Sequence, residues 1–183
     1  TRIPLTRSPT IRHADALETD WADMLAPERC DYVFGNPPYV GFVNRKADQK
    51  KALDQVLERT GVSGSRIDYV FGWFLKAAEY AQHGSPRTGF VATNSVSQGE
   101  QVAVVWPIIL EKYGMCISFA HRTFEWGSDA RGKAHVHVVV VGLDKKEHER
   151  RDKRLFNYET VTSQPEETVH RVISPYLVDT RVA

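Results

Sequence analysis

The sequence predicts one α/β domain, and three observations lead to this fold class. The chain of 183 residues has the length of a single domain. In its first two thirds, short apolar segments typical of strands alternate with amphipathic segments typical of helices, which indicates parallel strands covered by helices. In its last third, strand-like segments follow one another with no helix between them. We therefore expect a mostly parallel sheet with an antiparallel pair of C-terminal strands added at its edge.

The predicted strands are short apolar segments bounded by turn-forming or polar residues. The first is followed at once by Asn-Pro-Pro, the pattern of a buried strand that stops abruptly. A connection exposed to solvent is predicted for residues 145–154, because nine of these ten residues are charged. Strands are expected over residues 31–35, 89–94, 116–121, 135–143 and 155–160.

Three helices are predicted between these strands. The first two cover residues 46–60 and 68–81, and each carries apolar residues at helical spacing. Asp68 is a favourable N-cap for the second helix. The third helix is expected over residues 106–113, because Pro107 is tolerated in the first turn of a helix but not in its middle.

The composition excludes several classes of protein. There are 24 basic and 23 acidic residues, so the chain is not a uniformly basic nucleic-acid binder, although a local basic groove stays possible. Two cysteines, Cys30 and Cys116, are too few for a disulfide framework or a four-cysteine zinc site, which favours a cytoplasmic location. No apolar segment is long enough to span a membrane.

The motif Asn36-Pro37-Pro38-Tyr39 follows the first predicted strand and carries the predicted chemistry. An exocyclic amino group conjugated to a ring is a weak nucleophile, because its lone pair is delocalised. Acceptors aimed at its two hydrogens favour a pyramidal nitrogen and free that lone pair. The Asn36 side-chain oxygen and the Pro37 carbonyl can act as these acceptors, and no proline amide hydrogen competes with the amino group. Pro38 stiffens the loop, and the ring of Tyr39 can stack on an extruded base.

The motif resembles motif IV of the class I AdoMet-dependent amino-methyltransferases, which most often serves N6 methylation of adenine in DNA. Residues 93–101, the pair Trp106-Pro107 and residues 119–124 resemble one branch of this family, that of single-chain type II restriction-modification enzymes. The resemblance implies a partial Rossmann-like class I methyltransferase fold in a bacterial, cytoplasmic protein. The implied methyl donor is S-adenosylmethionine (AdoMet), and the implied partner is double-stranded DNA with a flipped adenine.

The resemblance assigns cofactor contacts to Asp15, Ala16 and Asn36. The segment Asp15-Ala16-Leu17 precedes Asn36 at the spacing of the family's motif III, whose acidic residue hydrogen-bonds the adenine of AdoMet. An ordinary helix start is the alternative interpretation of this short segment. Residues 68–81 match the helix of motif V, and residues 89–95 match the strand of motif VI.

The sequence departs from the family in one respect, because it contains no glycine-rich AdoMet loop before motif IV. Residues 1–183 then correspond to motifs III to VIII, the C-terminal portion of a methyltransferase domain, with residues 160–183 leading toward a target-recognition domain. We expect residues 31–35 to form an open sheet edge, with residues 1–30 displaced or a second copy paired to it. This piece alone is expected to bind AdoMet weakly and to be inactive.

Three further residues are candidates for substrate binding. Phe124 and Trp126 lie in a predicted loop that, in the family, reaches the flipped base, and core packing accounts for them equally well. Lys133 flanks this loop and is a candidate phosphate contact, although surface charge alone explains it as well. His135 and His137 alternate on one predicted strand, but no third ligand lies nearby, so no metal site is predicted.

Two other functions stay open at this point. Asn-Pro-Pro-Tyr also occurs in enzymes that methylate RNA bases or the side-chain amide of protein glutamine. The other alternative is a non-catalytic nucleic-acid-binding module that has kept the sheet and lost the chemistry. The intact motif from Asn36 to Tyr39 argues against this last alternative.

Overall fold

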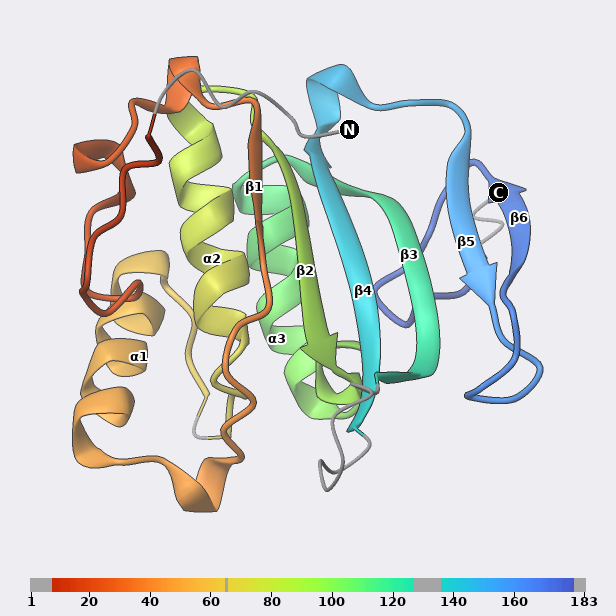
Figure 1. Cartoon of the computed structure of the whole chain (residues 1–183), viewed down its shortest axis with the longest axis horizontal. Coiled ribbons are helices and arrows are strands. Elements are labelled where there is room, and N and C mark those ends of the chain that lie inside the picture. The colour runs from red at the N-terminus through yellow and green to blue at the C-terminus, as the bar shows by residue number, and fades with distance from the viewer. Residues whose placement is uncertain (1–7, 65, 127–135, 180–183) are drawn as a thin grey trace.

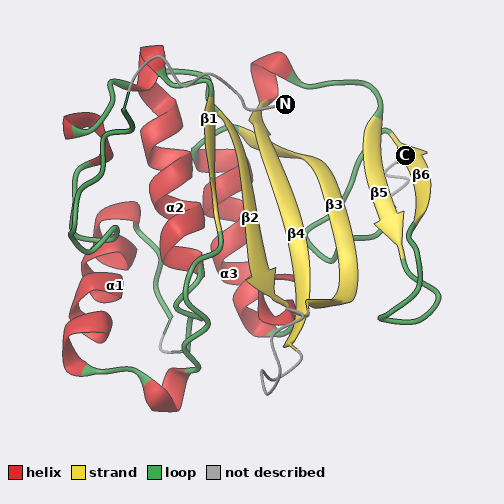
Figure 2. Cartoon of the chain, in the orientation of Figure 1, coloured by secondary structure: helices red, strands yellow, loops and turns green. Residues whose placement is uncertain are grey.

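The structure is a computed structural model that describes residues 8–64, 66–126 and 136–179. Within these residues, six strands form one mixed sheet in the order β1-β2-β4-β3-β5-β6 (Figure 1). Helices α2 and α3 cover one face of this sheet, and α1 packs beside α2, which confirms the α/β class (Figure 2). The elements are β1 (Tyr32–Gly35), α1 (Ala47–Thr60), α2 (Phe71–Tyr80), β2 (Arg87–Thr93), α3 (Glu100–Pro107), β3 (Met115–Trp126), β4 (Val136–Lys145), β5 (Lys153–Asn157) and β6 (Glu166–His170).

The predicted strand directions are correct only in part. β1 runs parallel to β2, and β3 runs parallel to β5. β4 and β6 are antiparallel to their neighbours, so the sheet is mixed. The antiparallel pair of β3 and β4 is confirmed, but it lies inside the sheet because β4 returns between β2 and β3. The polar strand β6 was not predicted, because the sequence Glu-Glu-Thr-Val-His has no apolar run.

The predicted start of α2 is three residues early. The helix begins at Phe71, and Asp68 belongs to a turn before it. The carboxylate of Asp68 accepts a hydrogen bond of 3.2 Å from the amide of Val70, so it still organises the chain that enters the helix. The spacing of apolar residues predicted the helix correctly. Its first residue was misplaced, because the Asp68 carboxylate bonds to residues before and outside the helix instead of capping it.

The predicted bounds of α3 are wrong. The helix begins at Glu100 after Gly99, which adopts a left-handed conformation with φ of 75°. Pro107 is its last residue and not part of its first turn, and a π-helical turn follows over Ile108–Lys112. Proline has no amide hydrogen and its ring displaces the carbonyl four residues earlier, so the regular bonding pattern ends there and a wider turn replaces it.

Two predicted loops are partly strand. Phe124 and Trp126 lie in β3, opposite Val138 and Val136 of β4, and not in a loop.

The charged segment 145–154 is not a purely solvated connection. The Lys153 side chain is only 3% exposed and its ammonium pairs with the carboxylate of Glu149. Pairing removes most of the cost of burying this charge.

An aromatic cluster joins the helices to the sheet. The ring of Phe74 on α2 lies 5.1 Å from that of Phe90 on β2 and 5.8 Å from that of Trp106 on α3. The indole nitrogen of Trp106 donates a hydrogen bond of 2.6 Å to the carbonyl of Val96, so its one polar group is satisfied. Edge-on aromatic contacts of this kind add to the stabilisation from burial. The cluster therefore holds β2, and through it β1, against the helical layer.

β1 lies at one edge of the described sheet, as predicted. The predicted displacement of residues 1–30 is wrong for the part that the structure describes from Ala16 onward, because side chains of α2 hold its backbone. Lys76 donates to the carbonyls of Leu17 and Thr19 at 2.9 and 2.5 Å, and Tyr80 donates to the carbonyl of Leu25 at 2.5 Å. Residues 1–7 lie outside the described residues.

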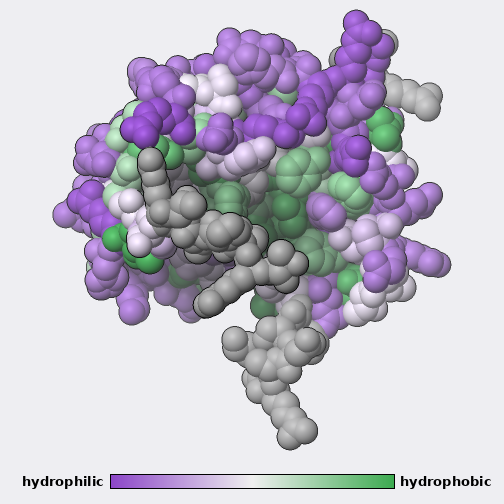
Figure 3. All heavy atoms as spheres, turned by 45° about the horizontal axis from the view of Figure 1, so that its top comes forward, coloured by the Kyte–Doolittle hydropathy of each residue, from purple (hydrophilic) through white to green (hydrophobic). Residues whose placement is uncertain are grey.

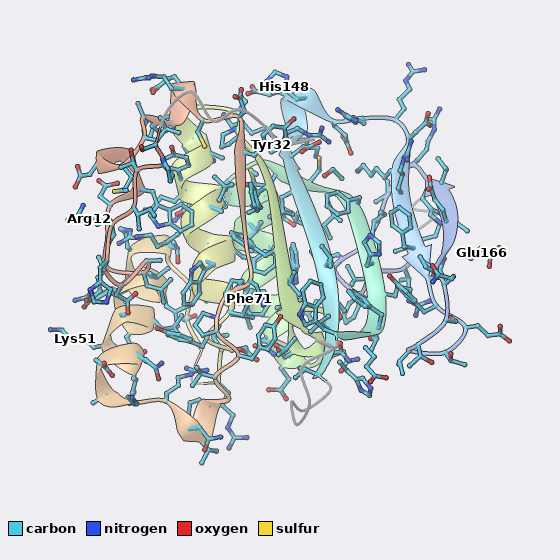
Figure 4. All side chains as sticks on the ribbon, viewed as in Figure 1. Arg12, Tyr32, Lys51, Phe71, His148 and Glu166 are labelled. Carbon is cyan, nitrogen blue, oxygen red and sulfur yellow. The ribbon has the colours of Figure 1, made fainter. Side chains whose placement is uncertain are left out.

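The face of the sheet away from the helices carries exposed apolar side chains. Phe34 pairs with Gly89, next to the helix-facing Phe90, and is 83% exposed. The neighbouring Tyr32, at the far end of β1 from Asn36, is 63% exposed (Figure 4). In Figure 3, apolar residues gather in the middle of the surface and hydrophilic residues surround them. Among the described helices, none is long and apolar enough to cross a lipid bilayer.

Gly84→Ala is expected to destabilise the fold by roughly 1–3 kcal/mol, the usual cost of overpacking. The added Cβ would lie 2.3 Å from the carbonyl oxygen of Pro27, a backbone atom that cannot rotate away. Gly41→Ala is the matched control, since its added Cβ meets no atom within 4 Å. Urea unfolding followed by tryptophan fluorescence measures both variants. Equal midpoints for Gly84→Ala and the unchanged protein would contradict the prediction.

Candidate functional site

The Asn36–Tyr39 loop leaves the C-terminal end of β1. Asn36 and Pro38 are exposed, Pro37 is buried and Tyr39 is half-buried, so the loop presents alternate residues to solvent. The last paired residue, Gly35, lies opposite Phe90 of β2. Neither proline can donate to a strand ladder, and the chain therefore turns out of the sheet here. The motif places Asn36 where a substrate can reach its side chain.

The side chain of Tyr39 contacts that of Asn36. The Tyr39 hydroxyl donates a hydrogen bond to Oδ1 of Asn36. Burial raises the pKa of Tyr39, so the hydroxyl keeps its proton and stays a donor. A stacking role for the ring alone does not predict this contact. The hydrogen bond from Tyr39 fixes the orientation of the Asn36 side-chain amide and leaves the second lone pair of its oxygen for another donor.

A cavity of about 740 Å³ lies beside the loop. Its walls include the aromatic side chains of Trp21, Trp73 and Phe90, and Asn36, Pro37 and Pro38 line it as well. The volume falls in the range of small-molecule sites, which are mostly apolar with a few polar groups. Sequence analysis missed Trp73, because an aromatic residue at helical spacing is indistinguishable from core until the fold is known.

Of the two residues predicted to hold the cofactor from motif III, the cavity includes one. Ala16 lines the cavity, whereas Asp15 does not. Asp15 is exposed, and its Oδ1 accepts a hydrogen bond of 2.7 Å from the amide of Leu17. The segment is thus a turn capped by Asp15 rather than a helix start. The indole of Trp21 donates to the carbonyl of Ala16 at 2.9 Å and holds this turn against the cavity.

Phe124 and Trp126 lie near the C-terminal end of β3. Because β1 and β3 run in the same direction, this is the end of the sheet at which Asn36 follows β1. Trp126 is 44% exposed. Phe124 stacks on Tyr158 with a centroid distance of 5.1 Å. The two strands are three strand spacings apart, roughly 14 Å. The sheet therefore places both aromatic residues at the same end of the strands as the motif, although not in contact with it.

The residues that flank the predicted aromatic loop are described only in part. Lys133 and His135 lie outside the described residues. The exposed His137 is opposite Glu125 in the pairing of β3 and β4. In the described part of the chain, no group of three His, Cys, Asp or Glu side chains is arranged to hold a metal ion.

A polar network follows β2 at the same end of the strands as the motif, and sequence analysis did not predict it. The Asp68 carboxylate accepts a hydrogen bond of 2.6 Å from Oγ of Ser95. Gln101 accepts from the amide of Asp68 at 2.8 Å and donates to the carbonyl of Ser95 at 2.9 Å. Arg45, from the loop that follows the motif, donates to the carbonyl of Ile67. These bonds tie together the three loops that follow β1, α1 and β2.

Comparison with known proteins identifies the family. The model of the MmeI DNA-methyltransferase domain family matches residues 1–157. This chain belongs to that family. DNA methyltransferase A of Bacillus subtilis (strain 168) is 36% identical over 182 residues, which cover 97% of this chain and 19% of that protein. The predicted resemblance to a DNA methyltransferase is thereby confirmed.

A solved structure agrees with this assignment. The type IIL restriction-modification enzyme MmeI, determined in complex with DNA, matches with a TM-score of 0.89 and 40% identity. The match covers 100% of this chain and 24% of the MmeI chain. The fold of the MmeI family is therefore the fold of this chain, which spans less than a quarter of either similar protein.

Asp68→Ala is expected to loosen the loop after β2. The change removes the acceptor of the Val70 amide and leaves the hydroxyls of Thr93 and Ser95 with each other as partners, at a cost of about 1–3 kcal/mol. Hydrogen–deuterium exchange measures the effect as faster exchange of amides in residues 94–98. Asp54→Ala removes an exposed carboxylate and serves as the control. Unchanged exchange in Asp68→Ala would show that the network does not hold this loop.

Proposed function

We propose that the protein containing this chain methylates the N6 amino group of adenine in DNA, as part of a restriction-modification enzyme. The observation that carries the proposal is the Asn36–Tyr39 loop, which exposes the Asn36 side chain next to an aromatic-lined cavity. Membership of the MmeI DNA-methyltransferase domain family supports DNA as the substrate. The similar MmeI structure contains DNA, which supports the same conclusion.

The loop would activate the amino group by accepting its hydrogens. Oδ1 of Asn36 accepts one, and the carbonyl oxygen of Pro37 accepts the other. Both bonds are strongest when the nitrogen becomes pyramidal, so they stabilise the transition state more than the bound substrate. The Tyr39 hydroxyl holds the Asn36 amide in the required orientation before the substrate arrives.

The reaction would need no dedicated base. After methyl transfer the nitrogen is positively charged and attached to an electron-poor ring, which makes it a strong acid. The described residues that line the cavity include no carboxylate and no histidine. The methylated nitrogen would therefore lose one of its two protons directly to water.

The target adenine would leave the duplex to reach the loop. The Tyr39 ring supplies a face for stacking, and base–aromatic stacking contributes roughly 1–3 kcal/mol. Phe124 and Trp126 approach the same edge from β3 and would contact the extruded nucleotide from the other side. Lys133 would contact a neighbouring phosphate.

The methyl donor would be AdoMet, and the volume and aromatic walls of the cavity support this choice. Ala16, Trp21 and Trp73 would hold it together with Asn36, because aromatic faces attract both a sulfonium cation and an adenine ring. Asp15, on the capped turn beside Ala16, would contact its polar groups. When bound, AdoMet supplies a methyl group attached to a positively charged sulfur, a good leaving group.

A methylation assay with the full-length protein tests the proposal against its alternatives. Double-stranded DNA, RNA and a glutamine-containing peptide are each incubated with AdoMet carrying a labelled methyl group. We expect label in DNA alone, recovered as N6-methyladenine by mass spectrometry. Label in RNA or in the peptide, or no transfer to any of them, would overturn the proposal.

Asn36→Ala is expected to abolish methyl transfer and to leave DNA affinity nearly unchanged. The Asn36 oxygen acts in the transition state, so its loss lowers the turnover number and not binding. Single-turnover methylation and DNA titration measure the two quantities separately. Wild-type turnover in this variant would exclude the assigned role.

Tyr39→Phe is expected to slow methyl transfer by about 2- to 12-fold, the equivalent of one net hydrogen bond of 0.5–1.5 kcal/mol. The variant keeps the ring but frees the Asn36 amide to rotate. Tyr39→Ala is expected to lose more, because stacking disappears as well. Tyr176→Phe, at an exposed tyrosine in the C-terminal segment, is the control. If Tyr39→Phe and the unchanged protein turn over equally fast, the hydroxyl has no positioning role.

A further inference from the structure

The loop that begins with the motif continues to an exposed apolar tip. Phe42 and Val43 form a short 3₁₀ turn with Asn44, closed by a hydrogen bond of 2.9 Å from the Asn44 amide to the carbonyl of Gly41. Phe42 is 51% exposed and Val43 is 89% exposed. In Figure 1 this orange turn projects at the bottom of the view, beyond the end of β1. Two adjacent apolar side chains are thus presented to solvent on the catalytic side of the sheet.

The tip is held in place rather than loose. The Arg45 guanidinium lies over the Phe42 ring, 5.3 Å from its centroid. The same guanidinium donates a hydrogen bond to the carbonyl of Ile67, in the loop before α2. A cation over an aromatic face stabilises the arrangement and limits the rotation of the ring. The side chain of Phe42 is therefore oriented in the absence of any partner.

Most charged side chains in the segment that carries the tip are basic, and Asp54 and Asp68 are acidic groups that act on Arg45. Arg45 and Lys46 follow the turn directly, and the exposed Arg66 adjoins Ile67, to which Arg45 is bound. Asp48 is the one carboxylate in residues 42–51. Lys51, on the first turns of α1, points away from the sheet (Figure 4). An apolar tip followed directly by Arg45 and Lys46 is complementary to a duplex, whose base faces are apolar and whose backbone is anionic.

The tip is close to the motif along the chain. Phe42 follows Tyr39 by three residues, which span at most about 11 Å. One base step of DNA rises about 3.4 Å along a strand. The chain from Tyr39 to Phe42 therefore spans no more than about three base steps.

We propose that Phe42 and Val43 form a wedge that enters the base stack next to the target adenine and favours its extruded position. This inference rests on the proposed function. Apolar side chains inserted between bases replace part of the stacking that is lost when a base leaves the helix. The wedge and the acceptor Asn36 lie on one continuous loop, so insertion of the wedge would be coupled to capture of the base.

The experiment uses the full-length protein and two duplexes containing its methylation site. One duplex is fully paired, and the other carries an abasic position opposite the target adenine, which lowers the cost of extrusion. Single-turnover methylation is measured for Phe42→Ala, Val43→Ala, the double variant and Phe42→Leu. Permanganate reactivity of the thymine opposite the target reports extrusion without depending on methyl transfer. Val169→Ala, at an exposed valine on β6, is the control.

We expect the double variant to methylate the paired duplex about tenfold more slowly, with weaker thymine reactivity, and the abasic duplex within about threefold of the unchanged protein. Phe42→Leu should retain most of the rate, because it keeps apolar bulk. Unaltered rates on the paired duplex, or an equal loss on both duplexes, would overturn the wedge. If the unchanged protein methylates neither duplex, the proposed function itself fails; if it methylates both and the variants match it, only the wedge fails.

Discussion

Two consecutive prolines end strand β1, and the candidate site depends on this end. Without amide hydrogens, Pro37 and Pro38 cannot continue the parallel ladder with β2, so pairing stops at Gly35. The chain leaves the sheet with the Asn36 side chain in solvent and its amide oriented by the Tyr39 hydroxyl. A strand that continued for one more pair would return these side chains to the pleat. The restriction on backbone pairing is thus what makes the polar groups available for chemistry.

The end of the sheet from which this loop leaves is held in place by two kinds of contact. Beneath it, the aromatic rings of Phe74, Phe90 and Trp106 fix the sheet to the helices. Around it, polar side chains connect loops that have no regular ladder, as Asp68 does with Ser95 and Arg45 does with the backbone at Ile67. The apolar contacts set the position of the edge, and the polar contacts set the orientation of the loops on it.

The sequence predicts features that depend on local chemistry and fails where distant contacts decide. The end of β1 and the exposed Asn36 follow from the prolines, and the α/β class follows from the alternation of patterns. The bounds of α3 were wrong, because burial of Val102, Val105 and Trp106 carries the helix up to Pro107 from the N-terminal side. Phe124 and Trp126 lie in a strand because β4 folds back against them. The walls of the cavity come from elements far apart in the chain, and no pattern within one segment shows that their residues line the same cavity.

The pairing of β1 with β2 has a consequence for how the chain folds. Tyr32 lies opposite Arg87, so this contact closes a loop of more than 50 residues, whereas β3 and β4 are close neighbours along the chain. Closure of a long loop costs conformational entropy before its contacts repay it, so local pairings form sooner. β2 is itself held by β4, which follows it by more than 40 residues. On a ribosome, Asn36 and Tyr39 would therefore be synthesised before β2 and β4 but reach their final positions only after those strands have assembled.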